Sequence, residues 1–411
     1  MKARPNRVVW ASVVVIGLAV ALAVTAWALA RDDTTSDTAS IDGPTTATDD
    51  TSRSPSTDTT VVEVTDDTLD RDRPLRSFTL AATGDFLIHA PVQRRAAANA
   101  GGTGHSFAPM FAQTSPIIAA ADLGLCHMET PISPDNRALS GYPIFNAPRE
   151  IAADAAASGY DGCSTASNHS LDKGASGVAA TLDVLDAASL KHAGTARSAL
   201  EAVTPTIYDV AGVKVGHLSF TYGTNGIPLP ADHPWSVNLI DANKILTDAT
   251  AAKNGGAEFV IVSLQWGNEY QSTPTPEQRG LARQLLASPD VDLIIGSHVH
   301  VVQPIEKIGD EYVAYGVGNF LSNQGAPSTP TASQDGMILQ VLVQEQPDGS
   351  FRTSNIVFTP TWVDRASYLI TLATPQTNRS SYDRTVAAVT ALGPLSFDGQ
   401  PGFAPIEEES Q

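Results

Sequence analysis

Ligand-type side chains stand at four places in this sequence where a predicted strand ends. The four segments are Thr83-Gly84-Asp85, His127-Met128-Glu129, Ser167-Asn168-His169 and Ser297-His298-Val299-His300. In an open α/β sheet, sites assemble beyond the carboxyl ends of the strands. We therefore expect these four ends to converge on one crevice.

The chemistry of these side chains favours a metal centre. Carboxylate, amide and imidazole groups suit a borderline divalent ion such as Mn, Fe or Zn, and a carboxylate shared between two histidine clusters would suit a pair of metals. Such a centre hydrolyses phosphate esters by activating water. Each piece alone is more typical of a turn or a loop cap, so the prediction rests on their joint placement.

The elements that must position these residues follow from the hydrophobic pattern after Pro74. Short apolar runs alternate with helical stretches, which indicates a layered α/β domain. The predicted strands cover residues 78–83, 122–126, 160–166, 259–264 and 291–295. A capping box at Thr275-Pro276-Glu277-Gln278 predicts a helix that ends before Pro289, and Val178, Leu182 and Leu185 recur at helical spacing.

Three hairpins are predicted in addition, so the sheets are expected to be mixed. They join 207–210 to 213–220, 302–308 to 312–315, and 337–343 to 351–358. The domain is predicted to span residues 75–365. Residues 366–411 are predicted to hold one helix near 382–392 and an acidic tail.

The N-terminal quarter of the chain differs from this domain in composition. Residues 1–7 are basic, residues 8–30 are 23 uncharged residues, and residues 31–74 are rich in Thr, Asp and Ser. This order predicts a cytoplasmic N-terminus, a transmembrane anchor and a disordered linker, with the domain outside the cell membrane. A cleaved signal peptide is the alternative, and it also exports the domain.

Charge and cysteine content set further limits. The formal net charge of −19 excludes a basic nucleic-acid groove as the main function. The two cysteines, Cys126 and Cys163, are too few for a disulfide framework. They form either a single bridge or two buried thiols.

Six motifs in order resemble the CapA family of bacterial capsule and poly-γ-glutamate biosynthesis proteins, which has a calcineurin-like metallophosphoesterase fold. They are TGDFLIH (83–89), DLGLCHMET (122–130), GYDGCSTASNHSLDKG (159–174), VSLQWGNEY (262–270), GSHVHVVQ (296–303) and YGVGNF (315–320). The resemblance covers about residues 77–325. It implies a layered metallophosphoesterase-like α/β sandwich with one or two divalent metal ions.

The resemblance also implies roles for single residues. Asp85 and His300 would hold one metal, Glu129 would bridge, and Asn168 and His298 would hold the second. His169 would stand beside the scissile bond as an acid, and Asp172 would orient it.

This chain departs from the family pattern at two positions. Gln265 stands where family members commonly have histidine, and a neutral amide is a poorer metal ligand than imidazole. His127 stands where they usually have asparagine, so it either replaces the lost ligand or faces solvent. His89 and Glu269 are further candidates, His89 as a ligand and Glu269 as a partner of a ligand histidine.

These observations predict a membrane-anchored, extracytoplasmic, metal-dependent phosphoesterase-type hydrolase. By resemblance it would serve the synthesis, transport or anchoring of capsule, poly-γ-glutamate or another anionic envelope polymer. Its expected partners are the membrane, membrane subunits of a capsule synthase, and the polymer or a small phosphoester. The alternative is a non-catalytic assembly or polymer-binding subunit of the synthase, which Gln265 favours.

Overall fold

The computed structural model of this protein describes residues 73–393. The predicted basic N-terminus, the apolar segment 8–30, nearly all of the linker and the last part of the acidic tail lie outside these residues. Between residues 73 and 393, no helix is both long and apolar enough to cross a membrane.

Strands and helices alternate along the first part of the described chain. The strands are β1 (Ser77–Phe86), β2 (Leu123–His127), β3 (Gly162–Ser164), β4 (Lys191–Ala193), β5 (Thr206–Val210), β6 (Val213–Thr221), β7 (Phe259–Gln265), β8 (Leu293–Ser297), β9 (Ile305–Ile308), β10 (Glu311–Ala314), β11 (Asn319–Leu321), β12 (Asp335–Glu345), β13 (Phe351–Val363) and β14 (Ile370–Leu372). The helices are α1 (Ala90–Asn99), α2 (Ala108–Phe111), α3 (Ser115–Ala119), α4 (Glu150–Ala157), α5 (Gly174–Ala187), α6 (Ala199–Val203), α7 (Ala242–Asn254), α8 (Pro276–Leu285) and α9 (Arg379–Val389), with a 3₁₀ turn η1 (Thr331–Gln334).

Within residues 73–393 the strands form two mixed sheets. The first has the order β14-β13-β12-β1-β2-β3-β4, with β11 also paired to β1, and the second has the order β5-β6-β7-β8-β10-β9. Strands β1 to β4 run parallel, as do β6, β7, β8 and β10, whereas the hairpin partners are antiparallel. The predicted mixed α/β architecture is therefore confirmed.

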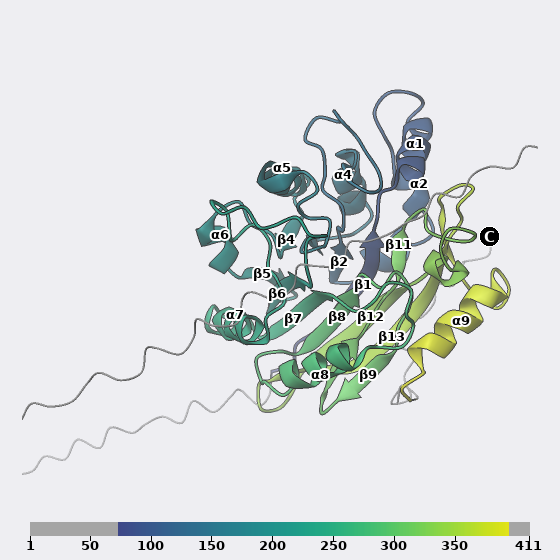
Figure 1. Ribbon diagram of the computed structural model, residues 1–411. Coiled ribbons are helices and arrows are strands. Elements are labelled where there is room, and N and C mark those ends of the chain that lie inside the picture. Colours follow the sequence, from purple (N-terminus) through teal and green to yellow (C-terminus); the bar gives the residue numbers. More distant parts are fainter. Residues whose placement is uncertain (1–72, 394–411) are drawn as a thin grey trace, which may run out of the picture. The chain divides into compact units, whose positions relative to one another are not determined.

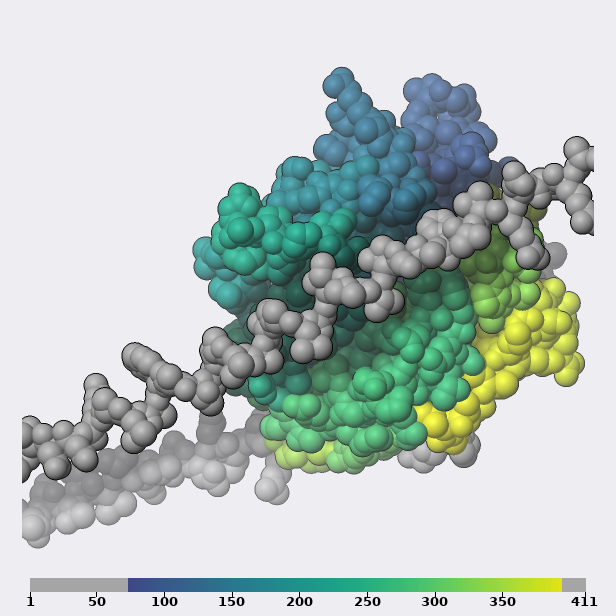
Figure 2. Space-filling model, viewed as in Figure 1, coloured from purple at the N-terminus to yellow at the C-terminus, as the bar shows by residue number. Residues whose placement is uncertain are grey.

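The two sheets pack face to face and carry helices on their outer faces (Figure 1). One apolar core lies between the sheets and contains Phe78, Leu80, Phe259 and Leu293. A second core lies between the first sheet and helices α1 to α5, and a third between the second sheet and helices α7 and α8. In the same view, residues coloured purple to teal form the upper half of the surface, and green to yellow residues form most of the lower half (Figure 2).

Local signals predicted several elements well. The hairpins β5–β6, β9–β10 and β12–β13 are all present, and α8 begins with a capping box in which Thr275 and Gln278 bond each other's backbone amides. Strand β14 and helix α9 follow residue 365, where the domain was expected to end. Both pack against it: β14 pairs with β13, and Arg384 of α9 forms an ion pair with Asp335 at 2.7 Å.

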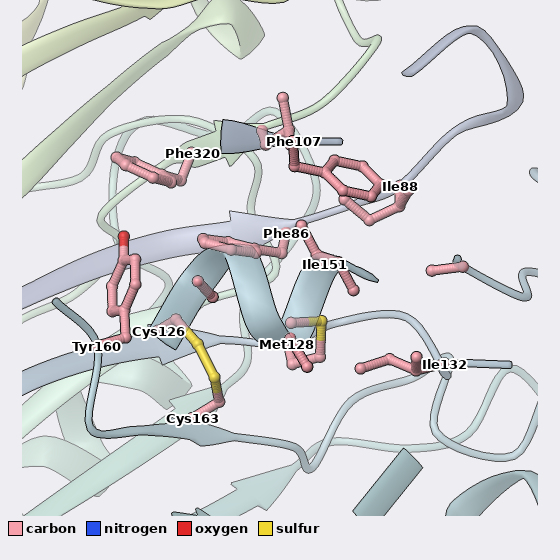
Figure 3. Close-up of a cluster of buried hydrophobic side chains, with 14 of the residues drawn as sticks. Phe86, Ile88, Phe107, Cys126, Met128, Ile132, Ile151, Tyr160, Cys163 and Phe320 are labelled. Carbon is pink, nitrogen blue, oxygen red and sulfur yellow. A yellow bond between two sulfur atoms is a disulfide. The ribbon is translucent and has the colours of Figure 1, made fainter. Parts of the chain in front are cut away.

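Cys126 and Cys163 face each other on the neighbouring parallel strands β2 and β3 and form a disulfide (Figure 3). The bridge lies in the core beneath the helices, beside Tyr160, Phe86 and Met128. Each cysteine precedes a residue of the candidate site, because His127 follows Cys126 and Ser164 follows Cys163. Of the two interpretations left open by the sequence, the structure has the bridge.

Gly84 lets β1 and β11 approach closely beside the candidate site. A Cβ atom at this position would overlap the carbonyl oxygen of Gly318, which accepts a hydrogen bond from the Asp85 amide at 3.1 Å. Replacing Gly84 by alanine is therefore expected to lower the free energy of unfolding by about 1–3 kcal/mol or more, as overpacking does. Urea denaturation measures this free energy of unfolding.

Gly280→Ala is the control, because Gly280 lies inside α8 with open space around it and its replacement should be neutral or stabilising. Equal effects of the two substitutions would contradict the close approach.

His217 of β6 is buried between the sheets, where its Nε2 lies 2.9 Å from Ser263 Oγ. Burial, with a smaller contribution from the nearby His127, lowers the pKa of His217 to about 3. Between this value and the ordinary pKa near 6.5, the unfolded chain binds a proton that the folded chain does not, so falling pH destabilises the fold. One such group contributes a slope of up to about 1.4 kcal/mol per pH unit.

His217→Asn is expected to flatten the loss of stability between about pH 6.5 and pH 4 by this single-group slope. The free energy of unfolding of the wild type, relative to that of the variant, should therefore fall steadily as the pH is lowered below about 6.5. Parallel pH profiles of wild type and variant would show that His217 is not held neutral.

Candidate metal centre

The parallel strands bring their carboxyl ends to one edge of the domain. Asp85 at the end of β1 pairs in register with His127 at the end of β2, and Gln265 at the end of β7 pairs with Ser297 at the end of β8. The residues after β8 then turn sharply: His298 has φ 85° and His300 has φ 56°. This left-handed backbone is uncommon outside glycine, although His adopts it more readily than most residues, and it occurs here at two of the predicted ligands.

Five of the predicted residues form one buried cluster. Asp85, His127 and Glu129 offer ligand atoms that all lie within 4.8 Å of one another, and so do Glu129, His298 and His300. Glu129 belongs to both groups, as expected for a shared carboxylate. The predicted convergence of the strand ends is therefore present in the structure.

Asp85 orients His300 within this cluster. His300 Nδ1 lies 2.8 Å from Asp85 Oδ2 and 3.1 Å from Asn319 Oδ1, and both oxygens accept. Nδ1 therefore carries the proton, and Nε2, 3.8 Å from Glu129 Oε1, is left for a ligand. A carboxylate that fixes a histidine in this way is typical of metal sites.

His127 is oriented in the same manner by Ser164. Its Nδ1 lies 2.8 Å from Ser164 Oγ, which itself donates to the Cys126 carbonyl oxygen at 3.4 Å, so the imidazole donates to the serine. His127 Nε2 and both carboxylate oxygens of Glu129 are buried without a hydrogen-bond partner among the described residues. Unpaired buried polar atoms are costly, and a divalent cation would satisfy all three.

Burial sets the protonation of the cluster. It lowers the pKa of His127 to about 4 and the pKa of His298 to about 3, so both imidazoles are neutral at pH 7, as metal ligands must be. Burial also raises the pKa of Glu129 well above its usual range. For His300, burial lowers the pKa, but the Glu129 charge and the Asp85 hydrogen bond and charge outweigh it and raise the pKa to about 9. A bound cation would take the place of the proton on Glu129 and of the second proton on His300.

Gln265 occupies the space between the two residues that the resemblance assigns to a second metal. Its Nε2 donates to Asn168 Oδ1 at 2.6 Å and lies 3.2 Å from His298 Nδ1. The amide orientation is fixed, because its oxygen accepts from the Asn168 backbone N–H at 3.2 Å and from Thr221 Oγ1 at 2.6 Å. The Gln265 amino group thus uses the same atoms of Asn168 and His298 that a second cation would need.

His169 and Asp172 form a pair next to the cluster. His169 Nδ1 lies 2.9 Å from Asp172 Oδ2, which also accepts from the Phe145 amide at 2.7 Å. Both side chains are largely buried, and the Phe145 ring packs edge-on against the imidazole at 4.7 Å. His169 Nε2 forms no hydrogen bond within the described residues. The predicted orienting contact of Asp172 is present.

The two further candidates, His89 and Glu269, and the buried Trp266 lie around the cluster. His89 is half-buried, its Nδ1 bonds the Leu87 carbonyl oxygen at 2.9 Å, and its ring packs on Phe145. Glu269 is exposed and bonds none of the imidazoles in the described chain, although its charge raises the pKa of His300. Trp266 is buried and donates to the Tyr315 carbonyl oxygen at 2.9 Å, which is a packing role.

Some residues of the site were not predicted from the sequence. Tyr222 follows β6 directly and its ring lies 4.4 Å from that of His298. Asn225 Oδ1 accepts from Asn168 Nδ2 at 3.1 Å. Tyr222 could have been predicted, because residues that directly follow a parallel strand such as β6 lie at the sheet edge where sites form. Ser164 ends β3, which is shorter than the predicted strand 160–166, whereas Asn225 and Phe145 carry no comparable signal.

With this geometry described, the comparison with known families becomes informative. Residues 79–324, well over half of the chain, match the family described as bacterial capsule synthesis protein PGA_cap. This chain belongs to the PGA_cap family. The matched segment contains every residue of the cluster and the His169–Asp172 pair, and the family assignment suggested by the six motifs is confirmed.

Three similar proteins carry names from the synthesis of capsule, PGA or polyglutamine. The chain is 28% identical over 190 residues to the capsule biosynthesis protein CapA of Bacillus anthracis, covering 46% of this chain and 45% of that one. It is 30% identical over 203 residues to the PGA biosynthesis protein CapA of Bacillus subtilis (strain 168), covering 47% and 49%. A probable polyglutamine synthesis accessory protein of Mycobacterium tuberculosis is 25% identical over 221 residues, covering 50% and 56%. The chain thus spans about half the length of the curated relatives it matches.

Solved structures give more distant similarities. A 5'-nucleotidase described as putative, from Staphylococcus aureus, shares 15% identity with a TM-score of 0.46, covering 76% of this chain and 58% of that one. The calcineurin-like phosphoesterase YfkN of Bacillus subtilis shares 16% identity with a TM-score of 0.43, covering 76% and 98%.

Proposed function

We propose that this chain is a metal-dependent phosphoester hydrolase that serves the synthesis, transport or anchoring of capsule, poly-γ-glutamate or a related envelope polymer. One observation carries the proposal. Three buried polar atoms, His127 Nε2 and both Glu129 oxygens, lack partners in the described chain, and Asp172 of the His169–Asp172 pair is close enough to Glu129 to act on it electrostatically. Ligands for a cation and an oriented acid therefore stand together.

One divalent ion, Mn, Fe or Zn, would be held by Asp85, His127, Glu129 and His300. When bound, such an ion supplies a Lewis acid and lowers the pKa of water. Gln265 supports a single ion rather than two, because its amide already bonds Asn168 and His298.

His169 would deliver a proton to the leaving group. In the protonated imidazole, Nδ1–H donates to Asp172, which stabilises the positive charge and holds the ring in place. The oxygen of a water molecule forms the new bond to phosphorus and releases one proton to solvent, the bond between phosphorus and the leaving oxygen breaks, and that oxygen takes the Nε2 proton of His169. His169 is then reprotonated from solvent. The products are an alcohol and the shortened phosphate ester.

We place the domain outside the cell membrane, anchored by residues 8–30, with membrane subunits of a capsule synthase as partners. The 23-residue uncharged run and the basic residues before it support this. The Cys126–Cys163 bridge also supports it, because disulfides persist in oxidising compartments. Protease added to intact cells should digest the domain if it is exported, and complete protection after removal of the cell wall would contradict this placement.

A non-catalytic assembly subunit is the second candidate, and Gln265 favours it, because the amide replaces an expected ligand. The two candidates differ in a direct assay. The full-length chain, supplied with Mn or Zn, is tested on phosphodiester, phosphomonoester and γ-glutamyl substrates. Metal-dependent hydrolysis of a phosphoester supports the enzyme. If no metal binds, and Asp85→Ala and His298→Ala leave function in the cell unchanged, the hydrolase proposal is wrong.

A further inference from the structure

The loop of residues 140–146 exposes large apolar side chains beside His169. Tyr142 is 77% exposed and Ile144 is 41% exposed, and the two side chains stand two residues apart on this loop. The ring of Tyr142 lies 6.5 Å from that of Phe145, and Phe145 in turn packs on His169. The exposed ring is therefore connected to the imidazole through one intervening side chain.

This loop is held in place by hydrogen bonds. Ser140 and Asn146 exchange backbone hydrogen bonds of 3.1 and 2.9 Å, and Ser140 Oγ donates to the Ile144 carbonyl oxygen at 2.7 Å. The Phe145 amide donates to Asp172 at 2.7 Å. Tyr142 is thus exposed on a fixed loop, so a ligand that covers it would not have to order the backbone first.

The charges around the cluster do not suit an extended polyanion. Several lysines and arginines of the described chain are paired with carboxylates, for example Arg76 with Glu258 and Lys253 with Asp292. The exposed carboxylate of Glu269 acts electrostatically on Glu129 and His300. A substrate should therefore bind most tightly when it carries one phosphate, which lies at the cluster, and when the rest of the molecule is uncharged.

Resting on the proposed hydrolase function, we infer that the substrate is a phosphoester whose leaving alcohol carries a ring, such as an aryl group or a sugar, and that Tyr142 is its platform. The leaving alcohol lies next to His169, because His169 gives it the proton. A ring attached there extends toward Phe145 and Tyr142. Aromatic side chains stack on flat rings and on the apolar faces of sugars, with a gain beyond the area they bury.

Binding of two phosphonates to the Mn-loaded full-length chain tests this without hydrolysis. Methylphosphonate and phenylphosphonate carry the same charged group and differ by the ring. Broadening of their ³¹P NMR signals by the bound Mn reports both affinity and position. Phenylphosphonate is expected to bind about two- to tenfold more tightly, the range of one aromatic stack. Tyr142→Ala should remove this preference, whereas Tyr142→Phe should keep it.

Leu200→Ala is the matched control, because Leu200 on α6 is 76% exposed and should not affect either ligand. Equal binding of both phosphonates by the wild type, or an unchanged preference in Tyr142→Ala, overturns the inference and leaves the hydrolase proposal standing. Absence of broadening with either phosphonate, in a chain that retains Mn, overturns the proposed function and this inference with it.

Discussion

Glu129→Gln is expected to weaken binding of the divalent ion by about a hundredfold or more, above the range of changes to groups that only orient a ligand. Glu129 lies in both ligand groups of the cluster, and both of its oxygens lack partners in the described chain. An amide of the same shape removes the charge and one of the two acceptors. Metal content after dialysis, and titration with Mn or Zn, measure the loss.

The same substitution is expected to stabilise the metal-free protein. Burial raises the pKa of Glu129, so the folded metal-free wild type at neutral pH must either take up a proton or keep an unpaired buried charge, at a cost of about 1–3 kcal/mol or more, and glutamine removes this cost. Adding metal should then raise the melting temperature of the wild type and leave that of the variant unchanged. Glu269→Gln is the control: it makes the same chemical change at an exposed carboxylate and should retain metal. Wild-type metal affinity in Glu129→Gln would contradict the assignment.

His169→Gln is expected to lower the rate of phosphoester hydrolysis by about 10²- to 10⁴-fold, the usual contribution of a positioned acid. Its metal content should not change, because His169 belongs to neither ligand group. Asp172→Asn should have a smaller effect, since asparagine still accepts from Nδ1 but no longer stabilises the protonated ring. Steady-state rates and metal content are measured on the same samples.

A leaving group that needs no proton separates this role from a structural one. With a p-nitrophenyl ester the loss in His169→Gln should be much smaller than with an alkyl ester, because nitrophenolate departs unprotonated. His233→Gln, on a surface loop and 42% exposed at its side chain, is the control and should match the wild type. Equal losses on both esters would show that His169 does not act as the acid.

Much of the site followed from the sequence because its signals are local. Buried parallel strands appear as continuous apolar runs, and the residue after such a run marks the sheet edge where sites form. From the sequence alone, this rule placed Asp85, Glu129, His298 and His300 together. The capping box of α8 and the hairpin turns are likewise encoded within a few residues.

The remaining features depend on contacts between distant segments. The family resemblance indicated that Gln265 stands where histidine is common, but only the structure shows its amide fixed by Thr221 and the Asn168 backbone. The orientation of His127 depends on Ser164, 37 residues further along the chain, and the Tyr142 loop reaches His169 through Phe145. No periodicity or spacing reports such pairs.

The metal stoichiometry of the wild type and of Gln265→His tests the central claim most directly. With Gln265 bonding both Asn168 and His298, the wild type is expected to hold one tightly bound ion per chain after exposure to Mn, Zn and Fe, measured by inductively coupled plasma mass spectrometry. Gln265→His is expected to hold two, because imidazole is a better ligand than the amide it replaces. A wild type with two ions, or with none, would contradict the account.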